Sequence, residues 1–112
     1  MNNLNRKISK AVEDTITFIE NNYDQDISLK LVSHKIYINA SYLGQVFKKE
    51  VGESFTDYVN NYRVQKAKEL LTTTSMKVYE ISEKVGFMDS HYFIKIFKKY
   101  TGLNPSDMKI IR

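Results

Sequence analysis

The sequence predicts an all-α fold of about seven helices in which one helical unit is used twice. The chain has 112 residues with a single Pro and four Gly, which favours helices over a turn-rich β fold. Apolar residues recur at spacings of three and four along most of the chain, as on one face of a helix. The segment 42–52 (YLGQVFKKEVG) reappears 50 residues later as 92–102 (YFIKIFKKYTG), which indicates a repeated unit.

Three short helices are expected in the first half of the chain. An apolar stripe places the first over about residues 8–21, after a polar tail of residues 1–7. Ser28 can cap a second helix that ends near Ile36, and Asn39 can cap a third that Gly52 ends. Only two residues separate Ile36 from Asn39, which is the tight connection of a helix-turn-helix. The side chains expected to point inward are Ile8, Val12, Ile16, Ile19, Leu29, Val32, Ile36, Leu43, Val46 and Phe47.

A long helix follows, and the pattern then restarts. Ser54 begins the long helix in a variant of the capping box, and the helix extends to about Thr73. Nineteen residues give about 28 Å, enough to hold two small subdomains at a fixed separation. A short fifth helix ends near Gly86. Asp89 caps a sixth helix that Gly102 ends, and Asn104 with Pro105 begins a seventh; the inward residues are Val78, Ile81, Val85, Phe93, Ile96 and Phe97.

These elements predict a domain organisation. We expect a first helix-turn-helix subdomain over residues 8–53, a linker helix over 54–74 and a second helix-turn-helix subdomain over 75–112. Two such units in one chain favour two helices that read DNA.

Composition excludes several classes of protein. The absence of Cys excludes disulfides and thiolate metal sites and suits a reducing cytoplasm. There is neither a run of 18 apolar residues nor a signal-peptide core, so we expect a cytoplasmic protein without a membrane span. His34 and His91 are far apart and lack a nearby Cys or paired acid, so no metal site is expected. No phosphate loop, nucleophile elbow or carboxylate pair is visible, so we expect no enzyme, no cofactor and no small-molecule ligand.

The net charge is +4, and its excess lies in the second half of the chain. Residues 1–56 contain seven basic and seven acidic side chains, whereas residues 57–112 contain ten and six. This balance is compatible with a polyanionic partner but does not require one.

The outward faces of the third and sixth helices are the candidate base-reading surfaces. Their residues are small, polar or basic, as entry into a major groove about 12 Å wide requires. Gln45 can pair with adenine, Lys95 with guanine, and Ile94 can contact a thymine methyl group. His91 can donate to a base acceptor or to a phosphate. The complete candidate set is Ala40, Ser41, Gly44, Gln45, Ser90, His91, Ile94 and Lys95.

A second set is suited to phosphate contact. Lys48, Lys49, Lys98 and Lys99 lie at the C-terminal ends of the two repeated helices, where they can flank a groove. Complementing the helix dipole is an alternative role, and the two roles are compatible. The N-terminus at Asn39 can offer backbone N–H groups to a phosphate.

The chain resembles the AraC/XylS-type DNA-binding domain from about residue 8 onward. The second half carries the specific part, VYEISEKVGF at 78–87, with Asp89, Tyr92-Phe93, Phe97-Lys98-Lys99, Gly102 and Pro105. The first half agrees at Ser41-Tyr42-Leu43, Phe47-Lys48-Lys49, Gly52, Ser54-Phe55, Tyr58, Arg63, Ala67, Leu70 and Leu71. Ser33 and Ser82 stand where the family often has Ala, and Met108 and Lys109 where it usually has an aromatic residue and Arg.

The resemblance implies two recognition helices in successive major grooves of double-stranded DNA. It implies a bacterial, sequence-specific transcription regulator, which we interpret as an activator that also contacts RNA polymerase. The chain looks most similar to the C-terminal output domain of AraC-type two-component response regulators. Two alternatives remain: a small stand-alone activator of the same family, and a helical protein-interaction module that binds no DNA.

Overall fold

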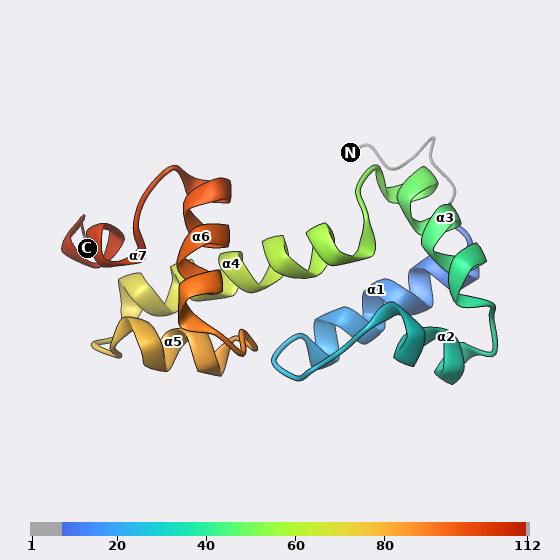
Figure 1. Ribbon diagram of the computed structural model, residues 1–112, viewed down its shortest axis with the longest axis horizontal. Helices are drawn as coiled ribbons and strands as arrows, with labels where there is room; N and C mark the ends of the chain where they lie inside the picture. The colour runs from blue at the N-terminus through green and yellow to red at the C-terminus, as the bar shows by residue number, and fades with distance from the viewer. Residues whose placement is uncertain (1–7, 112) are drawn as a thin grey trace. The chain divides into compact units, whose positions relative to one another are not determined.

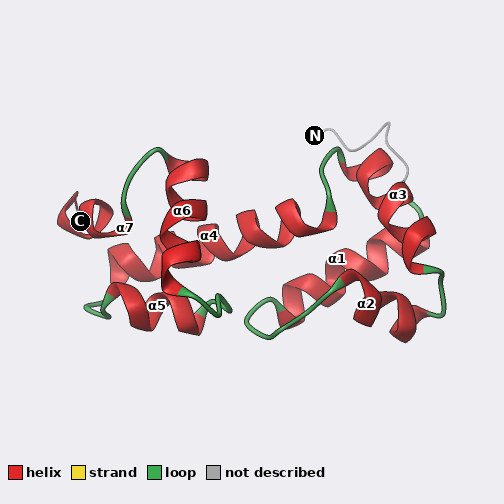
Figure 2. Cartoon of the chain, in the orientation of Figure 1, coloured by secondary structure: helices red, strands yellow, loops and turns green. Residues whose placement is uncertain are grey.

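The structure, a computed structural model, describes residues 8–111 and confirms the all-α prediction (Figure 1). These residues form seven helices and no strand. Figure 2 colours the helices red and the connecting loops green. The helices have the order that the sequence predicts, although the first begins at Lys10 rather than at Ile8. They are α1 (Lys10–Asn22), α2 (Leu29–Ile36), α3 (Ala40–Val51), α4 (Phe55–Thr73), α5 (Val78–Lys84), α6 (Ser90–Thr101) and α7 (Pro105–Ile111).

The chain divides into two compact units. The first unit contains the chain up to Asn22 together with Ile27–Val59, so it includes α1, α2, α3 and the start of α4. The second unit contains Tyr23–Asp26 and the chain from Asn60 onward, so it includes the rest of α4 with α5, α6 and α7.

The core of the first unit is formed by the apolar faces of its helices. The fully buried apolar residues are Val12, Ile19, Val32, Leu43 and Phe47. The Phe47 ring packs edge-on against Phe55 and Tyr58, with ring centroids 6.1 and 5.5 Å apart. The remaining residues that were expected to point inward are only half-buried: Ile8, Ile16, Leu29, Ile36 and Val46.

The second unit has its own core between α4, α5 and α6. Its buried cluster contains Val64, Ala67, Leu71, Ile81, Val85, Phe87, Phe93, Ile96 and Phe97. The rings of Phe87, Phe93 and Phe97 form a chain of tilted contacts, with centroids 5.1 and 5.6 Å apart. Each of the two repeated helices therefore has its apolar face buried in the core of its own unit.

The helix termini confirm the predicted caps. Ser28 Oγ accepts a hydrogen bond from the Leu31 N–H at 3.1 Å, and Asn39 Oδ1 accepts one from Tyr42 at 3.0 Å. Ser54 Oγ accepts one from the Asp57 N–H at 3.1 Å at the start of α4. The glycines that end α3 and α6, Gly52 and Gly102, have φ angles of 96° and 78°.

The turns of the two helix-turn-helix units contain equivalent backbone hydrogen bonds, but a different residue type has the positive φ in each. The Ile38 N–H donates to Ser33 O in the first turn, and the Phe87 N–H donates to Ser82 O in the second, both at 3.0 Å. The residue before the donor has a positive φ in each turn: 59° at Tyr37 and 103° at Gly86. Tyr37 therefore adopts a conformation that normally favours glycine, which sequence reasoning did not predict.

The two departures from the family pattern are accommodated. Ser33 and Ser82 are buried, and Ser33 Oγ donates to Lys30 O at 2.8 Å, so both fit where Ala is common. Met108 packs against the core of the second unit. The Lys109 ammonium donates to Met76 O and so attaches α7 to the loop before α5.

Arg63 of α4 forms hydrogen bonds with the loop at residues 23–26, in the second unit. Its guanidinium donates to Tyr23 O and to Gln25 O, each at 2.7 Å, and lies 5.6 Å from the centre of the Phe87 ring. Burial lowers the pKa of Arg63, against the opposing effect of Asp26 and Asp24. Arg63 thereby supports the turn before α6, a role that the sequence alone did not indicate.

Candidate nucleic-acid interface

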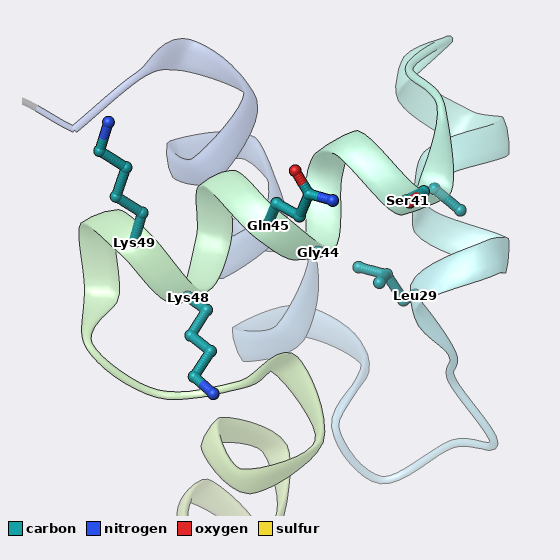
Figure 3. Close-up of a pocket in the computed structure, with 7 residues that line it drawn as sticks. Leu29, Ser41, Gly44, Gln45, Lys48 and Lys49 are labelled. Carbon is teal, nitrogen blue, oxygen red and sulfur yellow. The ribbon is translucent and has the colours of Figure 1, made fainter.

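The outer face of α3 gathers all of the candidate residues that the sequence placed on it. An open hollow of about 570 Å³ runs along this face. Figure 3 shows side chains that line it. Leu43 and Phe47 lie on the opposite face, buried in the core. The hollow is lined by Leu29, Ala40, Ser41, Gly44, Gln45, Lys48 and Lys49.

Exposure separates these residues into two kinds. The polar side chains of Ser41, Gln45, Lys48 and Lys49 are exposed, whereas Ala40, Gly44 and Leu29 are half-buried. Lys48 and Lys49 extend from the C-terminal half of α3 (Figure 3). The face thus combines an apolar floor with a polar and basic rim.

Leu29 is a member of this surface that sequence reasoning missed. The apolar periodicity assigned it to the core, but it is the first residue of α2 and lies beside Gly44 (Figure 3). A Cβ placed on Gly44 would be only 2.9 Å from Leu29 Cδ2. Gly44, a glycine inside α3, is the signal in the sequence that marks the close approach of Leu29.

The outer face of α6 is more basic. His91, Lys95, Lys98 and Lys99 are exposed, and Ser90 is half-buried. The His91 side chain is 95% exposed, and its Nδ1 lies 3.6 Å from Asp89 Oδ1. Asp89 also caps α6, because its Oδ1 accepts a hydrogen bond from the His91 N–H at 2.9 Å.

Ile94 differs from the other candidates on α6. It is half-buried and packs against the core of the second unit, so the exposed position expected from the sequence is only partly realised. Packing against this core accounts for the apolar side chain of Ile94. Its contact with a thymine methyl group stays a prediction.

The phosphate-contact candidates lie where the sequence predicted them. Lys48 and Lys49 occupy the last turn of α3, and Lys98 and Lys99 occupy the last turn of α6, all exposed. The Lys99 ammonium lies 5.6 Å from the centre of the Tyr100 ring. Cations at these positions also complement the C-terminal end of the helix dipole.

Similarity to known proteins decides the family. The family described as "Helix-turn-helix domain", of the AraC type, matches residues 32–109, which is 78 of the 112 residues. The chain belongs to this family. AraC-type domains are DNA-binding domains of transcription regulators, and the family is not one of enzymes.

Individual AraC-type relatives agree in sequence and in fold. The transcriptional regulatory protein YesN of Bacillus subtilis is 41% identical over 87 residues, which are 75% of this chain and 24% of YesN. The C-terminal domain of AraT, a response regulator from Geobacillus stearothermophilus, has a TM-score of 0.91 at 33% identity, covering 95% of this chain and 88% of that domain. The C-terminal domain of the two-component response regulator yesN from Fusobacterium nucleatum has a TM-score of 0.84 at 42% identity, covering 90% and 99%.

The AraC-type chain corresponds to only a part of its longer relatives. It spans between 13% and 34% of the length of three curated relatives that it matches. No helix in the described part of the chain combines the length and the apolar surface that crossing a lipid bilayer requires.

Proposed function

We propose that this AraC-type domain binds double-stranded DNA in a sequence-specific manner, with α3 and α6 as recognition helices in successive major grooves. The observation that supports this most is the shared design of the two helices. Each buries an apolar face in its unit, presents an outer face that is mainly small, polar or basic, and ends in an exposed Lys pair. This design matches a helix that enters a groove between two phosphate backbones.

Base reading is assigned to the outer faces. Gln45 reads adenine through N6 and N7, and Lys95 reads guanine through O6 and N7. Small residues toward the N-terminal ends of the helices permit close approach to the bases, and His91 adds a donor to a base or phosphate. The proposed base-reading set is therefore Ala40, Ser41, Gly44, Gln45, Ser90, His91, Ile94 and Lys95.

Phosphate contact is assigned to the helix ends. Lys48, Lys49, Lys98 and Lys99 neutralise phosphates beside the grooves, and the N-terminus at Asn39 offers backbone N–H groups to a further phosphate. These contacts supply affinity without sequence preference.

The domain is the output part of a two-component response regulator that activates transcription in the bacterial cytoplasm and contacts RNA polymerase. The support for this origin is the similarity to the response-regulator domains of AraT and yesN, at 33% and 42% identity. A small stand-alone activator of the same family is the alternative that retains the same DNA-binding surface.

The test is a selection of bound duplexes from a random-sequence pool at about physiological salt. Two enriched blocks about one helical turn apart are expected, because each recognition helix reads one major groove. A single enriched block would contradict base reading by one of the two helices. The absence of enrichment, with no salt-dependent binding of random duplex, would favour a helical protein-interaction module instead.

A further inference from the structure

We propose that the hollow beside α3 receives the 5-methyl group of a thymine in the major groove, with Leu29 as its apolar wall. The proposal rests on the proposed function, because it names a base that the first recognition helix reads. It also assigns specificity to a residue of α2, outside the recognition helix.

Leu29 packs directly against the α3 backbone at position 44, which has no side chain, and so forms a wall of the hollow. A Cβ at Gly44 would approach Leu29 Cδ2 to 2.9 Å, so a larger residue fits only if Leu29 moves. Glycine in a helix interior is less stable than alanine, and Gly44 has no positive φ that would require glycine. Helix stability therefore does not explain this glycine, whereas the close approach of the Leu29 side chain to the α3 backbone does.

The second unit provides an internal comparison. Ile94 stands 50 residues after Gly44 in the repeat, and Val78 begins α5 as Leu29 begins α2. Val78 and Ile94 are half-buried and pack against the core of their unit. In the second unit an isoleucine side chain therefore stands where the first unit has a glycine with Leu29 packed against it.

The chemistry of the hollow selects its occupant. Its floor is apolar, from Leu29, Ala40 and Gly44, and its exposed rim is polar and basic. None of the seven lining residues is acidic, which is complementary to the negative potential of duplex DNA. Among the base edges of the major groove, the apolar group is the thymine methyl.

Gln45 on the rim strengthens this assignment. Its amide has the donor and acceptor that adenine N6 and N7 require. Adenine pairs with thymine, so a contact from Gln45 to adenine brings a thymine methyl group into the same part of the groove. Leu29 and Gln45 then read the two members of one A·T pair, or of neighbouring pairs.

The test removes the methyl group alone. The probe is the duplex that the wild-type domain selects from random sequence, with its thymines replaced by deoxyuridine one at a time. We expect one replacement to raise the Kd of the wild-type domain about fourfold, the effect of losing one buried methyl-sized group. In the Leu29→Ala and Gly44→Ala variants, the ratio of the Kd for the deoxyuridine duplex to the Kd for the thymine duplex should fall to about one.

Two matched controls accompany these variants. Leu31→Ala truncates another leucine of α2, one that does not line the hollow, and should keep the fourfold ratio. Tyr79→Ala should also keep it, because Tyr79 is exposed in the second unit and belongs to neither proposed contact set. Gly44→Ala raises helix propensity, so its thermal unfolding midpoint should not fall, and it tests the site even if Leu29→Ala unfolds.

The outcomes separate this inference from the proposed function. If no deoxyuridine replacement weakens wild-type binding, or if the ratio persists in Gly44→Ala, the thymine site is wrong while DNA reading stands. If the ratio is lost in Ile94→Ala instead, the methyl contact belongs to α6. If the wild-type domain selects no duplex, the proposed function fails and the inference fails with it.

Discussion

At the scale of single residues, the turns before α3 and α6 contain the same left-handed backbone conformation in different surroundings. Tyr37 and Gly86 both have a positive φ and precede an N–H that donates to a buried serine carbonyl. The Tyr37 side chain is 94% exposed, so only its own backbone opposes the conformation. A Cβ at Gly86 would lie 2.5 Å from Tyr23 O and 2.9 Å from Arg63 Nε, so glycine is also required by packing.

Replacing Tyr37 by Gly should stabilise the domain. The change removes a left-handed conformation that costs a residue with a Cβ about 1–2 kcal/mol, part of which the greater freedom of glycine in the unfolded chain offsets. We expect a rise of about 0.5–1 kcal/mol in the free energy of unfolding, measured in urea. Tyr79→Gly is the matched control, because Tyr79 is exposed within α5 and glycine there should destabilise. A loss of stability in Tyr37→Gly would contradict the account.

Replacing Gly86 by Ala should destabilise the domain strongly. The added Cβ collides with the Tyr23 carbonyl and with the Arg63 guanidinium, which holds the loop 23–26. We expect a loss of about 2–4 kcal/mol in the free energy of unfolding. Gly52→Ala is the control, because φ is 96° there but nothing lies within 4 Å of the added Cβ, so only backbone strain is felt. Equal losses in the two variants would show that packing at Gly86 is unimportant.

At the scale of the element, the sequence predicted the helices well and the roles of some side chains less well. The caps at Ser28, Asn39 and Asp89 could be predicted because they depend on neighbours in the chain. Leu29 was placed in the core because periodicity identifies an apolar stripe but does not reveal that a glycine lies opposite it. The bonds from Arg63 to the loop at 23–26 join residues 38 and 40 apart in the chain, which local patterns do not report.

Two substitutions of Asn39, the N-terminal cap of α3, can distinguish its contribution to stability from its proposed contact with DNA. Asn39→Asp retains an oxygen that accepts the Tyr42 N–H, so we expect little change in the free energy of unfolding. If this helix end contacts a phosphate as proposed, the new negative charge should weaken binding to all duplexes by a similar factor. Asn39→Ala should instead lose about 1 kcal/mol of stability. Unchanged DNA affinity in Asn39→Asp would show that this end of α3 contacts no phosphate.

At the scale of the whole molecule, the candidate phosphate contacts are divided between the two units. Each exposed Lys pair ends one of the two proposed recognition helices, α3 and α6. Neutralised phosphates release counterions, so the logarithm of the binding constant falls with the logarithm of salt concentration by about 0.9 per contact. Both units should therefore contribute to the salt dependence of binding.

Replacing Lys48 and Lys49 by Ala should reduce the salt slope on random duplex by about two, and replacing Lys98 and Lys99 should do the same. Binding titrations across a range of salt concentrations measure the slopes. If replacing a Lys pair leaves the salt slope unchanged, that pair contacts no phosphate and only complements the helix dipole and increases solubility.

Whether both proposed recognition helices read bases can be tested by comparing Gln45→Ala with Lys95→Ala in the same random-sequence selection. Each variant is expected to lose preference in a different block of the site, at about 1–3 kcal/mol for the base concerned, while the other block stays enriched. A uniform loss of affinity on all sequences in both variants would contradict the account, because it would show that these side chains touch only the phosphate backbone.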